Sequence, residues 1–369
     1  MHGGRRDFIP VTQPTIPVGV QREYADVVKQ IIDSRMLSNW GEWNEQFEKG
    51  LAKATGAPTL TFPSGDSALI AMLAAMRMPP GSIVAVPSFT FNSTANAVLW
   101  NHLGLRFMDV SPETLVSGPK DMLVGDDDRN RSSAFLATHT FGVPCDITGT
   151  HFNGRPILFD GAHALGACAD GGVPVGSTGF ATSFSFSGTK ILTCGEGGAV
   201  ATKNKTLLRR LRYIRNYGFW KDYRTRFQGF NGKMSEFHAA LGTLLFPNFR
   251  GFVEKRRRLA WRYISLLWPL SDGAALEIPG ATEPGRVWNN FAIIIEDADR
   301  VHKRLAKAGI QTKRYFRPLH RMPFYGSDAV LPRTDFVAKR ILVLPLFAHM
   351  TDGQQDRVVA ELKKAVKPR

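Results

Sequence analysis

The chain has 369 residues, of which 43% are hydrophobic and 21% are charged. This length allows two domains and a large buried core, and the composition excludes a disordered chain, a collagen-like fibre and a small disulfide scaffold. The best apolar stretch, residues 68–76, is too short for a membrane span, and no apolar segment follows the basic residues near the start. We therefore expect neither a membrane partner nor a secretory signal.

Cysteine content indicates the compartment. The three cysteines, Cys145, Cys168 and Cys194, form no C-x-x-C pair. Their odd number and their spacing fit neither a disulfide framework nor a zinc site. We predict a reducing, cytoplasmic location and no metal site.

Charge is distributed unevenly along the chain. The net charge is 47 − 32 = +15, with 14 − 18 = −4 in residues 1–200 and 33 − 14 = +19 in residues 201–369. This asymmetry indicates an anionic partner for the C-terminal half, either nucleic acid or a phosphorylated small molecule, unless the charge is only a solvated helix face. No nucleic-acid-binding signature accompanies the charge, so we expect no nucleic-acid partner.

Apolar runs alternate with helical stretches up to about residue 202. Helices are predicted over residues 67–77 and 93–102. The predicted strands cover residues 83–88, 105–110, 134–140, 156–159, 182–186 and 198–202. Most of these runs are continuously apolar, which is typical of strands buried on both faces of a parallel sheet.

Beyond residue 203 the pattern becomes mainly helical. In order, we predict helices over 207–217, 235–245 and 252–267, an apolar run at 287–296, a helix from Asp297 or Asp299 to Gly309, a strand over 310–316 and a helix over about 352–366. The sequence therefore predicts an α/β protein with a large domain, residues 1–248, and a smaller C-terminal α+β domain, residues 249–369.

One lysine follows a buried apolar strand. The run TSFSFSGTK ends at Lys190 and is followed by GEGG at residues 195–198. Burial lowers the pKa of a lysine amine, and a neutral amine can form a Schiff base with a carbonyl compound. The alternative is an ordinary strand-end lysine that reaches water.

Two other segments offer groups that bind ligands. Asp160 directly follows the apolar run 156–159, at the edge where open α/β sheets bind ligands, although such an acid can also cap a loop. The letters SGDS at residues 64–67 place small residues at a helix start, which attracts phosphate, although a plain N-cap gives the same letters. A lysine for a Schiff base, an acid for a ring nitrogen and a helix start for a phosphate together describe a pyridoxal phosphate site.

The order of these segments resembles the DegT/DnrJ/EryC1/StrS family of pyridoxal-phosphate-dependent sugar aminotransferases, nearly from end to end. The spacing from Ser185 to Lys190, with the following GEGG, is the most specific match. The other matching segments are SGDSAL (64–69), VPSFTF (86–91), TANA (94–97), FG (141–142), CD (145–146), DGAHALG (160–166), RNYG (215–218), GFN (229–231), AALG (239–242), RPLH (317–320) and LPL (344–346). The resemblance implies the aspartate-aminotransferase-like fold of type I, with a mostly parallel seven-stranded sheet flanked by helices.

The resemblance also implies a role for each matched position. Lys190 and Asp160 would be catalytic: Lys190 would carry pyridoxal 5′-phosphate as an aldimine, with pyridoxamine phosphate as intermediate, and Asp160 would pair with the ring nitrogen. Asn231 would reach the cofactor phosphate of a neighbouring subunit, which implies a homodimer with shared sites, and His320 would contact the substrate. Further cofactor contacts would be Phe91 on the ring face, His163 near the ring hydroxyl, and Gly65, Asp66, Ser67 and Ser185 at the phosphate.

These residues predict an aminotransferase that moves an amino group from an amino acid, which we expect to be glutamate, to a keto-sugar linked to a nucleotide. A sister branch that dehydrates keto-sugars has histidine in place of the lysine, and the intact Lys190 argues against that chemistry. Two alternatives stay open. One is an aminotransferase for a cyclitol or another cyclic ketone of antibiotic biosynthesis, and the other is a non-catalytic nucleic-acid-binding protein on the same scaffold.

Overall fold

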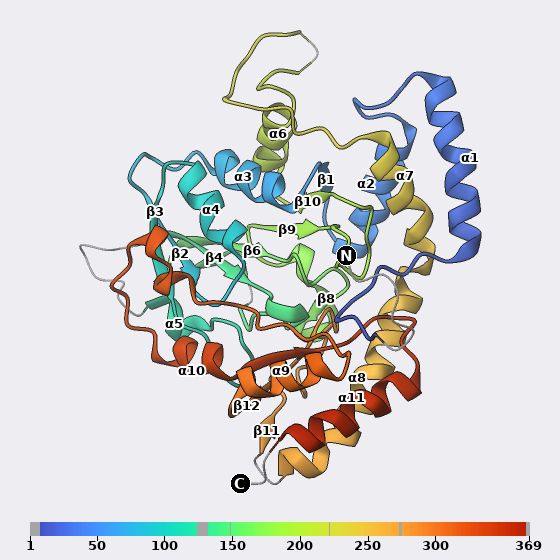
Figure 1. Ribbon diagram of the computed structural model, residues 1–369. Coiled ribbons are helices and arrows are strands. Elements are labelled where there is room, and N and C mark those ends of the chain that lie inside the picture. The colour runs from blue at the N-terminus through green and yellow to red at the C-terminus, as the bar shows by residue number, and fades with distance from the viewer. Residues whose placement is uncertain (1–7, 124–131, 148, 221, 273–274, 367–369) are drawn as a thin grey trace.

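A mostly parallel β-sheet lies at the centre of the molecule (Figure 1). A computed structural model describes residues 8–123, 132–147, 149–220, 222–272 and 275–366. The strand order is β1 (Thr59–Phe62), β10 (Gly198–Ala201), β9 (Ala181–Ser185), β6 (Arg155–Asp160), β4 (Ser132–Thr138), β2 (Ile83–Pro87) and β3 (Gly104–Met108). Neighbouring strands are parallel from β9 to β3, whereas β10 is antiparallel to both β1 and β9.

The predicted fold class is confirmed. Six of the seven strands along this path coincide, within a few residues, with strands predicted from the apolar runs. The sequence does not predict β1, because its four residues alternate threonine with leucine and phenylalanine outside the region of regular apolar runs. A short eighth strand, β5 (His151–Phe152), pairs with β6, and β7 (Cys168–Ala169) with β8 (Val173–Pro174) forms a separate small ribbon.

Both faces of the sheet are buried, which accounts for the continuously apolar strands. Leu136 and Leu158 pack in the core beneath α3 (Gly65–Met76), α4 (Asn92–Trp100) and α6 (Lys205–Ile214), which cover one face (Figure 1). Phe135 and Phe159, their neighbours along the same strands, belong to the core on the other face, together with Met122 of α5 (Pro119–Leu123). Alternate side chains of each strand are therefore apolar in both directions.

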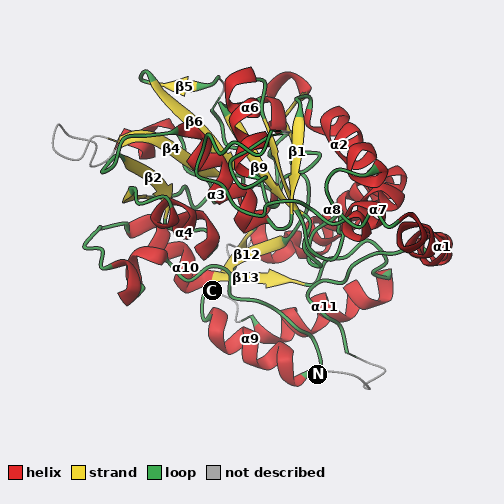
Figure 2. Ribbon diagram, turned by 90° about the horizontal axis from the view of Figure 1, so that it is seen from above, coloured by secondary structure: helices red, strands yellow, loops and turns green. Residues whose placement is uncertain are grey.

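Three helices form a layer beside β1: α1 (Val18–Ser34), α2 (Glu42–Thr55) and α7 (Glu236–Leu245). They lie together at one side of the sheet in Figure 2, and α7 packs on both of the others. The buried Glu236 carboxylate accepts hydrogen bonds from the N–H groups of Gly41 (3.0 Å) and Trp43 (2.9 Å), and so it caps the start of α2. The apolar face of α7 is thus covered within its own chain.

The C-terminal elements surround a second, smaller sheet. Its antiparallel order is β11 (Leu276–Glu277), β12 (Phe291–Ile295) and β13 (Ile341–Leu344). The helices packed around it are α8 (Phe249–Asp272), α9 (Ala298–Lys307) and α11 (Asp352–Ala365), and they share one apolar core with its strands. No helix in the described part of the chain has the length and apolar character needed to cross a membrane.

The prediction of a strand over residues 310–316 is wrong. Only isolated bridges form there, between Ile310 and Ile9 and between Lys313 and Val343. The segment leaves the sheet because Phe316 turns inward and stacks on Phe141, with ring centroids 5.5 Å apart. The third strand of this sheet is instead β13, which the sequence does not predict.

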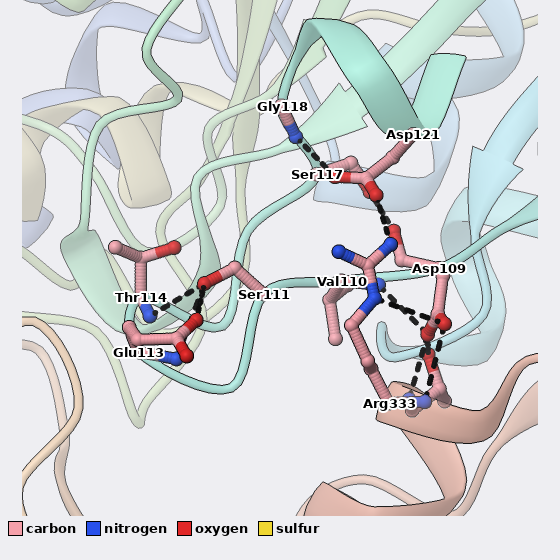
Figure 3. A network of polar contacts seen from close by, with 10 residues as sticks. Asp109, Val110, Ser111, Glu113, Thr114, Ser117, Gly118, Asp121 and Arg333 are labelled. Carbon is pink, nitrogen blue, oxygen red and sulfur yellow. Dashed lines mark hydrogen bonds and ion pairs between the residues drawn. The ribbon is translucent and has the colours of Figure 1, made fainter. Parts of the chain in front are cut away.

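A polar network joins α10 (Pro332–Arg340) to the end of β3 (Figure 3). Asp109 accepts hydrogen bonds from the N–H groups of Arg333 (3.1 Å) and Thr334 (2.6 Å), and the Arg333 guanidinium bridges Asp109 and Asp121. Burial acts to raise the pKa of Asp109, but hydrogen bonds from Thr334, Val110 and Arg333 hold it below its usual value. The network therefore fixes the C-terminal elements against the large sheet.

Candidate active site

A cavity of about 370 Å³ opens at the carboxyl ends of three neighbouring parallel strands. Thr138 ends β4, Asp160 ends β6 and Ser185 ends β9. This edge is where open α/β sheets bind their ligands. The residues that line the cavity include Ser64, Gly65, Asp66, Thr90, Phe91, Thr138, Asp160, His163, Ser185, Ser187, Lys190, Glu196, Asn289, Asn290, Tyr315 and Phe316.

The Asp160 carboxylate is held from two directions. Its Oδ1 atom accepts a hydrogen bond from the N–H of Ala162 at 3.0 Å, and its Oδ2 atom accepts one from the Thr94 hydroxyl at 2.7 Å. The Thr94 hydroxyl lies 2.9 Å from that of Thr90, which in turn lies 3.2 Å from the hydroxyl of Thr138. The four side chains therefore form a buried chain of hydrogen bonds, and its two ends, Thr138 and Asp160, are register partners in the sheet.

Burial raises the pKa of Asp160, while the hydrogen bonds from Thr94 and Ala162 and the charge of Lys190 act to lower it. A carboxyl group with a raised pKa is stabilised in its charged form by a cation placed against it. A protonated ring nitrogen is such a cation. The site therefore suits a ligand that brings positive charge to Asp160.

Lys190 lines the same cavity, in the turn after β9. Burial lowers its pKa to about 8, against the charges of Asp160 and Glu196, which act to raise it. At neutral pH about a tenth of an amine with this pKa is unprotonated, far more than for an exposed lysine. An unprotonated amine can act as a nucleophile toward a carbonyl carbon.

The start of α3 forms a cradle for an anion. Ser64 and Ser67 form a capping box, which uses the N–H of Ser67. The N–H groups of Gly65 and Asp66, in the first turn, have no acceptor within the helix. A Cβ atom at residue 65 would lie 2.9 Å from Cβ and 3.1 Å from Oγ of Ser185. Only glycine at this position therefore lets the Ser185 hydroxyl lie against the start of α3. Two N–H groups and a hydroxyl can thus bind a phosphate together.

Aromatic rings border the cavity. Phe91, at the start of α4, is 57% exposed, and its ring centroid lies 6.5 Å from that of Phe316. The His163 ring stacks on Phe316 at 6.2 Å, and its Nδ1 atom accepts a hydrogen bond from the N–H of Phe141 at 3.3 Å. Burial, with the charge of Lys190, holds the pKa of His163 well below its ordinary value, so the ring is neutral at pH 7.

Three predicted site residues do not line this cavity within the chain. The Ser67 hydroxyl is used in the capping box. Asn231 is exposed and lies in a separate groove of about 690 Å³, lined by Trp40, Tyr217, Phe219, Trp220 and Tyr223 among others.

His320 is not brought to the cavity either. Its side chain is fully buried, with Nδ1 2.6 Å from the Ser88 hydroxyl and Nε2 3.4 Å from Asp335. Its predicted contact with substrate is therefore not supported by this position. The ring instead links the segment after residue 316 to the end of β2.

The structure adds residues in and beside the cavity that the sequence argument does not assign. Thr94 lies in a matched segment but has no expected role, and its hydroxyl proves to bind Asp160. Asn289 and Asn290 directly precede the apolar strand β12 and line the cavity. Two polar residues at the start of a buried apolar run are the signal that could have found them.

Comparisons with known proteins agree with this geometry. The model of the DegT/DnrJ/EryC1/StrS aminotransferase family matches residues 19–363. A UDP-N-acetyl-3-dehydro-alpha-D-glucosamine 3-aminotransferase of Acidithiobacillus ferrooxidans is 30% identical over 353 residues, covering 92% of each chain. A dTDP-4-amino-4,6-dideoxy-D-glucose transaminase of Escherichia coli is 28% identical over 93% of this chain and 95% of its own. The crystal structure of NtdA from Bacillus subtilis with the cofactor PMP bound has a TM-score of 0.86 at 25% identity, over 99% of this chain and 86% of its own.

The family match spans most of the chain and includes every residue of the cavity from Ser64 to Phe316. Lys190, the buried Asp160 and the start of α3 all lie within the matched residues. The chain therefore belongs to the DegT/DnrJ/EryC1/StrS aminotransferase family, and it is a pyridoxal-phosphate-dependent aminotransferase.

Proposed function

We propose that this aminotransferase takes an amino group from glutamate and transfers it to a keto-sugar that is linked to a nucleotide. The observation that carries the proposal is that two relatives matched over most of their length are named for nucleotide-linked sugars, one for a UDP-linked dehydro sugar and the other for a dTDP-linked amino sugar. The net charge of +19 on residues 201–369 supports an anionic substrate, because it attracts a diphosphate. Neither relative is named for a cyclitol, so that alternative is not favoured.

The cavity fits pyridoxal phosphate at three separate points. The start of α3, where Gly65 leaves room for the Ser185 hydroxyl, would hold the phosphate. Asp160 would face the ring nitrogen, and Lys190 would bind the aldehyde carbon covalently. Phe91 would lie against the ring face. These assignments rest on two features of this chain. A Cβ atom at residue 65 would fill the space beside Ser185, and burial raises the pKa of Asp160, so its charged form is stabilised by a cation.

The residues of the chain then supply the proton chemistry. When bound, the cofactor draws the electrons of a substrate C–H bond into its protonated ring. The Lys190 amine, whose pKa burial lowers to about 8, would take the proton from the substrate α-carbon and deliver it to the carbon of the cofactor that carried the aldehyde. Asp160, fixed by Thr94 and Ala162, holds a negative charge at the ring nitrogen and so keeps a proton there. Phe91 and Phe316 reduce the access of water to the reacting atoms.

The function is tested by incubating purified protein with pyridoxal phosphate, glutamate and a panel of nucleotide-linked keto-sugars, with products detected by mass spectrometry. We expect at least one keto-sugar to be converted to its amino sugar. If the cofactor accepts the amino group of glutamate but only sugar-free ketones are aminated, the proposed substrate class is wrong while the aminotransferase activity stands.

We also propose a homodimer in which Asn231 completes the site of the neighbouring subunit. Its support is position: Asn231 is exposed outside its own cavity, and Tyr217 and Tyr223 beside it are 47% and 81% exposed. The burial of α7 does not add support, because α1 and α2 cover it within the chain. A two-fold interface makes both sites depend on it equally.

The homodimer is tested by mixing subunits that carry Lys190→Ala with subunits that carry Asn231→Ala. One site of each mixed dimer then has both residues intact, so activity should exceed the mean of the two parent proteins. Unchanged activity after demonstrated subunit exchange would show that Asn231 serves only its own chain.

Two further expectations stay predictions. The three cysteines are unpaired, and Cys145 and Cys194 are buried, which suits the expected cytoplasmic location. The predicted division at residue 248 coincides with the start of α8 at Phe249. Limited proteolysis and fractionation of cells that make the protein would test the two expectations.

A further inference from the structure

Two neighbouring asparagines form a pair at the C-terminal wall of the cavity. Asn289 and Asn290 both line the cavity, and the Asn289 side-chain amide donates a hydrogen bond of 2.7 Å to the Asn290 side-chain oxygen. Among the described residues, the Oδ1 atom of Asn289 and the Nδ2 atom of Asn290 have no partner. The pair therefore presents one free acceptor and one free donor.

The backbone of this pair is held by two buried arginines. Arg256 of α8 donates to the carbonyl oxygens of Trp288 (2.9 Å) and Asn289 (2.6 Å). Arg286 donates to the carbonyl oxygen of Asn290 at 3.5 Å, and its guanidinium lies 3.6 Å above the Trp288 ring centroid. Three consecutive carbonyl groups at the cavity wall are thus fixed by two guanidinium groups.

The burial of these two guanidinium groups opposes folding. Burial lowers the pKa of Arg256 to about 10 and that of Arg286 to about 9, although the charge of Glu283 acts to raise the pKa of Arg286. In the described part of the chain, no carboxylate forms an ion pair with either guanidinium. A buried charge without an opposite charge opposes folding. Such a cost is characteristic of groups that hold a binding site in one geometry.

The chemistry of the pair selects among the ligands of this enzyme. The carboxylates of an amino acid are bound best by cations, which two neutral carboxamides do not supply. A sugar hydroxyl both donates and accepts a hydrogen bond, so it can satisfy the free oxygen of Asn289 and the free amide of Asn290 together. The rings of Tyr315 and Phe316 line the same cavity and offer apolar surface to a sugar ring.

We propose that the Asn289–Asn290 pair recognises a hydroxyl group on the ring of the sugar acceptor, and that Arg256 and Arg286 are the residues that position it. This inference rests on the proposed function, and it names the part of the cavity that selects the sugar. A site built to bind a hydroxyl group rejects the analogue that lacks it, because its own polar groups are then left unpaired.

The test measures each of the two half-reactions separately in the variant Asn290→Leu, whose new side chain has about the volume of asparagine. Glutamate is the probe for the first half-reaction, and UDP-N-acetyl-3-dehydro-α-D-glucosamine is the probe for the second. The amino sugar dTDP-4-amino-4,6-dideoxy-D-glucose probes the second half-reaction in the reverse direction, in which it donates its amino group. We expect the second-order rate constant with the sugar that the wild type uses to fall about 10- to 100-fold, and that with glutamate to change less than about threefold. Asn92→Leu is the matched control, because Asn92 is exposed at the start of α4 beside the cavity but does not line it.

Deoxy analogues of the same sugar identify the hydroxyl. Removal of the recognised group should slow the wild type more than it slows Asn290→Leu, since that variant has already lost one of the two partners of the hydroxyl. The positioning role of Arg256 is tested by Arg256→Met, which should lower the rate constant with the sugar but not that with glutamate. Arg256→Lys should restore part of the lost rate. If Arg256→Met does not fold, the Asn290→Leu measurements alone decide.

Each outcome has a distinct meaning. If the wild type aminates a nucleotide-linked sugar but Asn290→Leu slows neither half-reaction, or slows both equally, the inference is overturned and the proposed function stands. If the wild type aminates no nucleotide-linked sugar, both are overturned.

Discussion

The two walls of the active-site cavity are built from different kinds of group. The wall at the sheet edge presents titratable residues, Asp160, Lys190 and His163, whose pKa values are shifted by burial. The wall from the C-terminal part presents neutral side chains, Asn289 and Asn290, on a backbone held by buried arginines. In the proposed mechanism, charge at the sheet edge would serve steps common to both half-reactions, whereas the neutral groups opposite would select one substrate. Substitutions at the sheet edge should therefore slow both half-reactions.

The strongest test of the sheet-edge wall is Lys190→Ala. Loss of the amine removes both the covalent attachment and the proton carrier, so both half-reactions should slow by about 10³-fold or more. Stopped-flow absorbance measures both rates, and the visible absorption band of the bound cofactor should be missing. Lys203→Ala is the control, because Lys203 is exposed just after β10.

Borohydride reduction of the wild type gives an independent check of the same residue. The reduced cofactor should be found on the peptide that contains Lys190. A label on any other lysine would remove Lys190 from its assigned role.

Asp160→Asn should affect chemistry more than cofactor capture. The variant keeps the shape of the side chain but loses the charge that holds a proton on the ring nitrogen, while the phosphate cradle at Gly65 is unchanged. We expect both half-reactions to slow by roughly 10²-fold with the cofactor still bound. Exposed Asp170 gives the matched control, Asp170→Asn. Turnover near that of the wild type would exclude Asp160 from the mechanism.

Gly65→Ala tests the cradle rather than the chemistry. Its methyl group would lie 2.9 Å from Cβ of Ser185 and must displace that side chain from the start of α3. The dissociation constant of pyridoxal phosphate should rise about 10-fold, as expected for the loss of one hydrogen bond to a charged group. Gly251→Ala is the control, because nothing lies within 4 Å of a Cβ atom there. An equal affinity in both variants would show that Ser185 does not bind the phosphate.

The same contrast explains how much of the site could be read from the sequence. Asp160 is predictable because it follows a continuously apolar run, and Lys190 because it follows a buried strand and precedes the sequence GEGG. Asn289 and Asn290 precede the apolar strand β12, which marks them as candidates, but the sequence does not show that they reach the cavity. Their place at the cavity depends on Arg256, which is 33 residues distant in sequence from Asn289 and meets it only after folding.

His320 and residues 310–316 show the same limit. His320 has the residue type expected of a substrate contact, but tertiary packing places its ring between Ser88 and Asp335. The segment 310–316 has the pattern of a strand, but the inward turn of Phe316 prevents continuous pairing. In both cases local pattern is overridden by contacts with distant parts of the chain.

The smallest expected effect concerns the pH dependence of cofactor capture by the cofactor-free protein. Only the neutral amine attacks, and the pKa of Lys190 is lowered to about 8, so the capture rate should rise about tenfold between pH 6 and 7 and level off above about pH 9. The charge of Glu196 acts to raise this pKa, so Glu196→Gln should move the midpoint to lower pH. Stopped-flow absorbance after mixing with pyridoxal phosphate gives the rate, and comparison of the two proteins cancels the titration of the cofactor itself. A midpoint near that of an ordinary lysine would show that burial does not tune this amine, and the same midpoint in both proteins would show that the charge of Glu196 does not raise its pKa.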